Sequence, residues 1–147
     1  MKLPLVLLSL EKLNELSIQG LDKFTPVFHD SSYAGQRSVL RDPTSQNGLP
    51  SIGHYVKKVL MVSNNDAYNA LYEFMGQGPA NSQLKKKGYN IRVTSRLERP
   101  VSIEQNRHTE AIRFVKNDTL VYRQPGLFKP GFDHTRSHGI EGKWIHK

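Results

Sequence analysis

The sequence contains no cysteine among its 147 residues, which excludes disulfide bridges and metal sites built on thiolates. It also has no apolar run near the roughly 20 residues that a membrane-spanning helix requires. Acidic residues are scarce, 13 against 21 basic ones, so the formal net charge is +8. Hydrophobic residues make up 37% and charged residues 23% of the chain, which is typical of a globular protein with one ordinary core.

The excess of positive charge raises the question of a nucleic-acid partner. Most lysines and arginines are scattered, and the densest run, Lys85-Lys86-Lys87, stands before Gly88 at the end of an expected helix. Cations there face the partial negative charge of a helix C-terminus. The run therefore favours helix stabilisation, and we expect no nucleic-acid partner. A non-catalytic basic binding module, contacting an anionic polymer through these lysines, stays as an alternative.

The apolar stretch at residues 3–10 has the length of a secretion signal, but it continues into Glu11-Lys12-Leu13-Asn14-Glu15 without a small-residue cleavage site. We interpret it as the first half of a buried helix over residues 3–16. Between residues 17 and 50 turn-forming residues are frequent and periodicity is weak, so no element is predicted there.

Two further helices are predicted on either side of a polar triplet, Ser63-Asn64-Asn65. The first begins after a Ser51 N-cap and carries an apolar stripe at Ile52, Tyr55, Val56, Val59 and Leu60. The second covers residues 66–75, and Asn64, Asn65 and Asp66 are all suitable N-caps for it. The stretch Gly76-Gln77-Gly78-Pro79 then separates it from a fourth helix at residues 80–87.

The pattern changes after Gly88. Residues 91–94 alternate, and residues 111–115 and 119–122 are strand-like runs around a Lys116-Asn117-Asp118 turn. Residues 96–109 are polar and predict a loop, and we expect residues 125–147 to form a poorly packed tail. The fold class predicted is therefore α+β, with a helical part at residues 1–124 and a short β-hairpin near its end.

Three segments resemble the serine β-lactamase-type hydrolases, meaning the class A β-lactamases and the related penicillin-binding proteins. Residues 2–8, Lys-Leu-Pro-Leu-Val-Leu-Leu, are similar to the start of the central helix, where Ser-x-x-Lys leads into an apolar run. Residues 62–69, Val-Ser-Asn-Asn-Asp-Ala-Tyr-Asn, are similar to the Ser-x-Asn loop and the helix it opens. Residues 94–99, Thr-Ser-Arg-Leu-Glu-Arg, look like the entry to the omega loop.

The resemblance implies roles for four residues. Lys2 would be the lysine of Ser-x-x-Lys, which activates a serine one helical turn away. Ser63 would relay a proton to the leaving nitrogen, and Asn65 would hold the lysine and bind the substrate amide. Glu104 is the candidate for the carboxylate that activates water for deacylation. The family implies a bacterial, periplasmic or secreted enzyme without a cofactor, whose substrate is a β-lactam or a peptidoglycan-like peptide and whose activity gives antibiotic resistance.

The sequence also departs from this pattern. The family's nucleophilic serine would stand three residues before Lys2, and its Lys-Thr-Gly strand would follow the tail, so we expect a truncated chain that is inactive on its own. Asn64 replaces the usual aspartate of β-lactamases, and Glu104-Gln105-Asn106 does not reproduce the Glu-x-x-x-Asn spacing. A D,D-peptidase or esterase relative is therefore an alternative within the enzymes.

Asp133, His134 and His138 are spaced like metal ligands, but the glycines around them favour no metal site.

Overall fold

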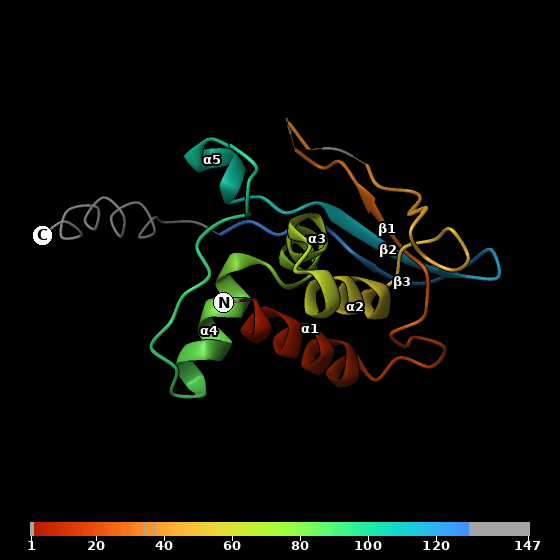
Figure 1. Ribbon diagram of the computed structural model, residues 1–147, viewed down its shortest axis with the longest axis horizontal. Coiled ribbons are helices and arrows are strands. Elements are labelled where there is room, and N and C mark those ends of the chain that lie inside the picture. Colours follow the sequence, from red (N-terminus) through yellow and green to blue (C-terminus); the bar gives the residue numbers. More distant parts are fainter. Residues whose placement is uncertain (1, 34, 37, 130–147) are drawn as a thin grey trace, which may run out of the picture.

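The computed structural model describes residues 2–33, 35–36 and 38–129 (Figure 1). Helices and strands occur in the order α1, β1, α2, α3, α4, α5, β2 and β3. The helices are α1 (Leu3–Leu16), α2 (Ile52–Val62), α3 (Asn65–Met75), α4 (Gln77–Lys86) and α5 (Ile103–Asn106); the strands are β1 (Val27–Asp30), β2 (Ala111–Lys116) and β3 (Thr119–Gln124). The predicted α+β class, with a hairpin near the end of the described residues, is confirmed.

Helix α1 has the predicted bounds. Pro4 lies in its first turn, where a missing backbone N–H costs nothing, and Ser17 ends it in the left-handed region at φ 51°. Leu5, Val6 and Leu8 are buried, whereas Leu3 and Leu7 are 53% and 56% exposed. The helix therefore buries one face and leaves apolar side chains of its first two turns in contact with solvent.

Helices α2 and α3 form a corner around the polar triplet. The Ser51 hydroxyl accepts a hydrogen bond from His54 N at 3.1 Å and so caps α2, as predicted. Asn64 is the N-cap of α3, because its side-chain oxygen accepts from Ala67 N at 2.7 Å. Between the two caps, Ser63 takes the left-handed conformation at φ 54°, which turns the chain sharply enough for α3 to pack against α2.

The sheet has three antiparallel strands in the order β1-β2-β3. The β2–β3 turn has positive φ at Asn117 and Asp118, 51° and 62°, the geometry of the tight hairpin turns that match strand twist. Strand β1 was not predicted from the sequence. Its inward positions are Val27 and His29, and a buried histidine conceals the alternation of apolar and polar residues that indicates a strand.

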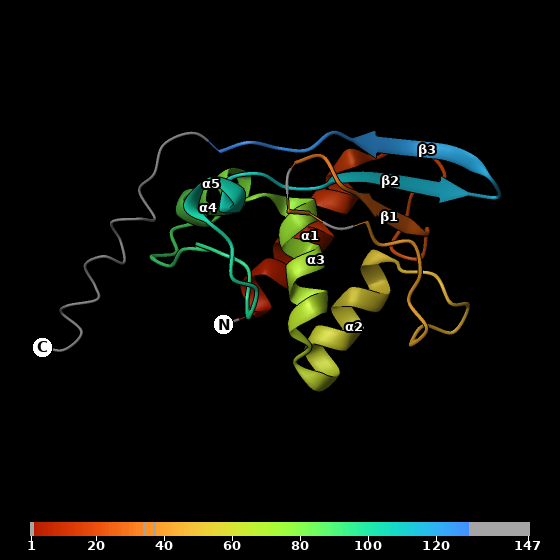
Figure 2. The same cartoon turned by 90° about the horizontal axis from the view of Figure 1, so that it is seen from above.

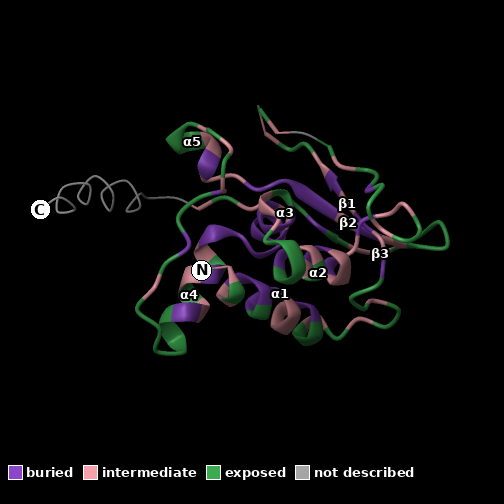
Figure 3. Ribbon diagram, viewed as in Figure 1, coloured by how far each residue is buried: buried purple, intermediate pink, exposed green. Residues whose placement is uncertain are grey.

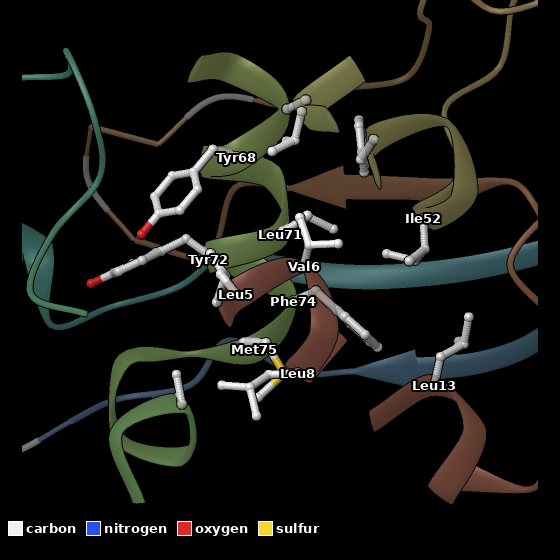
Figure 4. Packing of buried hydrophobic residues seen from close by; sticks show 14 of the residues in the cluster. Leu5, Val6, Leu8, Leu13, Ile52, Tyr68, Leu71, Tyr72, Phe74 and Met75 are labelled. Atoms are coloured by element: carbon white, nitrogen blue, oxygen red, sulfur yellow. The ribbon is translucent and has the colours of Figure 1, made fainter. Parts of the chain in front are cut away.

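The core lies between the helices and the sheet (Figure 2). Buried residues are concentrated on α1, α3 and β2 (Figure 3). Leu5 and Leu8 of α1 lie against Phe74 and Met75 of α3 (Figure 4), and the Phe74 and Phe114 rings meet edge to face with centroids 5.7 Å apart. Because α3 crosses this core, most of its residues are buried, including the polar Asn69 and Glu73.

Three predictions after residue 76 need correction. Helix α4 begins at Gln77, three residues earlier than predicted, with Pro79 inside its first turn. Residues 91–94 form a connection and no strand; the Asn81 side chain bonds the N–H and the carbonyl of Val93 at 2.6 and 2.8 Å. The predicted loop at residues 96–109 contains α5, which Ser102 caps through a reciprocal pair of hydrogen bonds with Gln105.

The beginning of the predicted tail is in contact with the rest of the chain. Leu127 exchanges two hydrogen bonds with Thr109, and Lys129 N donates to the Arg107 carbonyl at 3.0 Å. The remainder of the tail, with the Asp133, His134 and His138 group, lies outside the described residues. Among the helices of the described residues, none combines the length and the apolar character needed to cross a membrane.

Candidate active site

The Lys2 ammonium group lies at the corner between α2 and α3. It is the N-cap residue of α1, and α1 packs against both of these helices. Its Nζ donates to Ser63 Oγ at 2.8 Å, to the Ser63 carbonyl at 2.5 Å and to Asn65 Oδ1 at 2.6 Å. Residues more than sixty positions apart in the sequence are thus brought within hydrogen-bond distance of one another.

The hydrogen bonds use the full donor capacity of the lysine. An ammonium group has three N–H donors, and the three acceptors are two oxygens of Ser63 and one of Asn65. The Ser63 hydroxyl accepts from the lysine, so its own proton can be directed at an acceptor in a bound substrate. The arrangement can therefore pass a proton outward through Ser63, with Lys2 supplying the replacement.

The backbone of the corner holds these side chains in place. Ser63 is one of five non-glycine residues with positive φ in the described part of the chain, a conformation that costs energy and is frequent at functional sites. Asn65 is fixed because it is the first residue of α3 and follows a capped position. The polar ends of both side chains thus face Lys2 as a consequence of how α2 stops and α3 starts.

Glu104 is not brought to this cluster. It lies in α5, where its carboxylate pairs with Arg107 Nη1 and His108 Nε2, each at 3.3 Å, and its side chain is 50% exposed. The structure places these partners around it, and none is Lys2, Ser63 or Asn65. The sequence-based role of Glu104 in activating water stays a prediction without a supporting contact.

A polar face of α3, separate from Asn65 at its start, holds the segment that contains Glu104. Asn69 makes two hydrogen bonds with the backbone of Leu97, at 2.7 and 2.9 Å. One turn later Glu73 receives two hydrogen bonds from Arg96, at 2.5 and 3.1 Å. Beyond the end of α3, Gln77, the first residue of α4, donates to the Thr94 carbonyl at 2.9 Å. Helices α3 and α4 therefore position residues 94–97 together.

The Glu73–Arg96 pair is buried, with side-chain exposures of 2% and 3%. Burial alone would lower the pKa of Arg96, but the hydrogen bonds and the negative charge of Glu73 raise it, so the guanidinium stays protonated. Arg96 also donates to the His108 carbonyl at 2.7 Å. One ion pair thus fastens both ends of the segment around α5 to α3.

Sequence reasoning missed these anchoring residues. Asn69 and Glu73 stand four positions apart among the apolar residues of α3, and this spacing places them on one helix face. A polar stripe on a helix that must be buried is a signal for a bound polypeptide segment.

Among the described residues, no group of three or more His, Asp or Glu side chains is arranged to hold a metal ion.

The structure is that of an α+β protein in which a lysine, a serine and an asparagine side chain meet at the corner between two helices. A family model described as the β-lactamase enzyme family matches residues 1–124, and the chain belongs to this family. A search of curated proteins found no match, and neither did a search of solved structures.

Proposed function

We propose that Lys2, Ser63 and Asn65 form the proton-relay half of a serine acyl-transfer site that opens β-lactam amide bonds. The observation that carries the proposal is the set of three hydrogen bonds from Lys2 Nζ to Ser63 and Asn65. Family membership supports a hydrolase of the β-lactamase type. The small-molecule substrate class and a periplasmic or secreted location follow from the same membership.

In the proposed reaction the nucleophile is a serine one helical turn before Lys2, ahead of the first residue of the sequence. In its neutral amine form, which has two N–H donors and a lone pair, Lys2 takes the serine proton as the oxygen attacks the amide carbon. Ser63 then donates its proton to the amide nitrogen as the carbon–nitrogen bond breaks, and Lys2 returns a proton to Ser63. Asn65, beside Lys2, donates its side-chain N–H to the carbonyl of the substrate's side-chain amide.

The acylation step has more support than the hydrolysis of the acyl-enzyme. The relay requires only Lys2, Ser63 and Asn65, which are together, whereas deacylation needs a carboxylate that holds water, and Glu104 is paired elsewhere. A D,D-peptidase or esterase relative, which uses the same relay with slower deacylation, is thus the second candidate.

The experiment is covalent labelling with a fluorescent penicillin of a chain extended upstream in its reading frame. We expect labelling of a serine three positions before Lys2. Ser63→Ala should slow labelling by about 10²–10⁴-fold, the usual contribution of general acid–base catalysis. Asn64→Asp is the matched control, because it preserves the α3 cap and should leave the rate within a few-fold. Labelling that is absent, or insensitive to Ser63→Ala, would contradict the proposal.

A further inference from the structure

A pocket of about 260 Å³ opens beside Lys2, between the start of α1, helices α3 and α4, and residues 91–97. The Lys2 side chain forms part of its wall, so the pocket adjoins the proposed relay. Much of the remaining wall is apolar and comes from Pro4, Leu84, Ile91, Val93 and Leu97. A substrate group that lies next to Lys2 therefore has an apolar space to enter.

Tyr68 brings a buried polar side chain to this wall. It is 6% exposed, whereas the polar residues Thr94 and Ser95 of the same lining are exposed. Tyr68 stands three residues after Asn65, so the two lie on one face of α3, one turn apart. The face of α3 that adjoins Lys2 thus carries first the relay asparagine and then this tyrosine.

The hydroxyl of Tyr68 differs from those of two other buried tyrosines, which are bonded. The Tyr55 hydroxyl lies 3.0 Å from His29 Nε2. The Tyr72 hydroxyl donates to the Asn106 carbonyl at 3.1 Å. Within the described residues the Tyr68 hydroxyl has no hydrogen-bond partner. Because buried polar groups are nearly always paired, this hydroxyl indicates a partner that a ligand supplies.

The direction of the Tyr68 side chain supports this interpretation. Its hydroxyl lies on the side away from Leu71 in the packed core (Figure 4), and its oxygen is not one of the unpaired atoms that the protein encloses completely. Since Tyr68 lines the pocket, the accessible hydroxyl faces that space. Burial raises the pKa of Tyr68, so the hydroxyl keeps its proton and can both donate and accept a hydrogen bond.

The size of the pocket suits an aromatic ring with a polar substituent. A cavity of roughly 150 Å³ lined by apolar side chains takes benzene, and this pocket is larger, at about 260 Å³. In the proposed reaction Asn65 holds the carbonyl of the substrate's side-chain amide. The group attached to that amide then extends along α3 toward Tyr68.

We propose that this pocket is a specificity subsite that binds an aromatic side chain of the substrate, with a hydroxyl or similar ring substituent hydrogen-bonded to Tyr68. The ring is buried against the apolar wall, and Tyr68 selects the substituent without taking part in proton transfer. The choice of substrate rests on the proposed acyl transfer. Binding of an aryl amide to the pocket, however, requires no nucleophile.

Binding is measured on the 147-residue chain by nuclear magnetic resonance titration with 4-hydroxyphenylacetamide, phenylacetamide and acetamide. We expect phenylacetamide to bind about tenfold or more tightly than acetamide, because its ring is buried. The hydroxylated probe should bind about threefold to tenfold more tightly again, the usual effect of one hydrogen bond. Equal binding of the three probes, or no binding at millimolar concentration, would overturn the proposal.

The variant Tyr68→Phe removes the hydroxyl alone. The hydroxylated and plain aromatic probes should then bind equally, and the melting temperature of the free chain should not fall, because the hydroxyl has no partner in the described protein. Tyr89→Phe, at an exposed tyrosine outside this pocket, is the matched control and should keep the preference. A preference that persists in Tyr68→Phe would mean that the probe binds elsewhere, against the proposal.

Labelling of the upstream-extended chain separates this inference from the proposed function. Penicillins with a hydroxyphenylacetyl and a phenylacetyl side chain should label at rates that differ by the same factor of about three to ten, and Tyr68→Phe should equalise them. Equal rates in the parent chain would refute the subsite and leave the relay intact. No labelling, together with selective binding of the probes, would refute the relay and support the subsite.

Discussion

At the scale of residues, the partners of Lys2 and of Glu104 decide what each charged side chain can do. Lys2 has three oxygens around its Nζ, from two residues at the end of one helix and the start of the next. Glu104 has an arginine and a histidine as partners. The first arrangement gathers three acceptors around one cation, whereas the second holds a carboxylate on the surface.

Glu104→Gln is predicted to leave the deacylation rate of the upstream-extended chain within about twofold. The carboxylate is half exposed and paired with Arg107 and His108, and paired surface charges contribute little. The measurement is the decay of the fluorescent acyl-enzyme, and the double variant Glu104→Gln/Gln105→Glu is a control that moves the charge by one position. A loss of about a hundredfold in Glu104→Gln would instead establish the sequence-based role.

The site residues Lys2, Ser63 and Asn65 could be proposed from the sequence because the segments that contain them resemble sequence patterns of the serine β-lactamase-type hydrolases. Their meeting could not be derived from those patterns, since it depends on α1 packing against the α2–α3 corner. Glu104 shows the limit of the approach. A carboxylate of the right type was available, but it pairs with Arg107 and His108 at the i,i+3 and i,i+4 spacings of a helix turn, and the sequence analysis predicted a loop there.

At the scale of elements, α3 connects the site with the core. One end carries Asn65, its polar residues Asn69 and Glu73 hold residues 96–97, and its apolar side packs on α1 and β2. The helices were predictable because caps and stripes at Ser51 and Asn64 are local signals. Strand β1 and helix α5 were not, because a buried His29 and a four-residue helix give no periodic pattern.

Lys12 of α1 predicts a stability profile that depends on pH. Its Nζ donates to the Phe74 carbonyl and to Gln124, and burial lowers its pKa from 10.5 to about 8. Between these values the unfolded chain binds more protons than the folded one, so the free energy of unfolding rises with pH. We expect a gain of about 1–2 kcal/mol from about pH 7.5 to 9.5.

The rise should end above about pH 10, because burial raises the pKa values of Tyr55, Tyr68 and Tyr72 and their phenols ionise first in the unfolded chain. Urea unfolding at a series of pH values measures the profile. Lys12→Met should flatten the rise, whereas Lys57→Met, at an exposed position of α2, should preserve it. An equally steep rise in Lys12→Met would show that another group is responsible.

At the scale of the whole molecule, one apolar surface is left open beside α1. Leu3, Leu7 and Tyr89 are more than half exposed, and with Leu84 and Ile91 they line a groove of about 420 Å³ between α1 and α4. An open apolar groove promotes association between molecules. The sequence analysis predicted a buried first half for this helix, and the exposed Leu3 and Leu7 depart from that prediction.

We expect the isolated chain to be marginally stable and to self-associate through this groove. The double variant Leu3→Gln/Leu7→Gln should reduce light scattering at micromolar concentration without lowering the melting temperature by more than a few degrees. Leu120→Gln, a similarly exposed leucine on β3, is the matched control and should scatter like the parent. A monomer that melts cooperatively at high temperature before any substitution would contradict this expectation.

The central claim is that Lys2 and Asn65 interact in the folded chain, and a double-mutant cycle on the free energy of unfolding tests it most directly. Lys2→Met and Asn65→Ala should show a coupling of about 1–2 kcal/mol, the contribution of a hydrogen bond to a charged group. The parallel cycle of Lys2→Met with Asn64→Ala should show none, because the Asn64 side chain caps Ala67 instead. A coupling near zero between Lys2 and Asn65 would mean that the relay is not assembled, and the acyl-transfer proposal would be withdrawn with it.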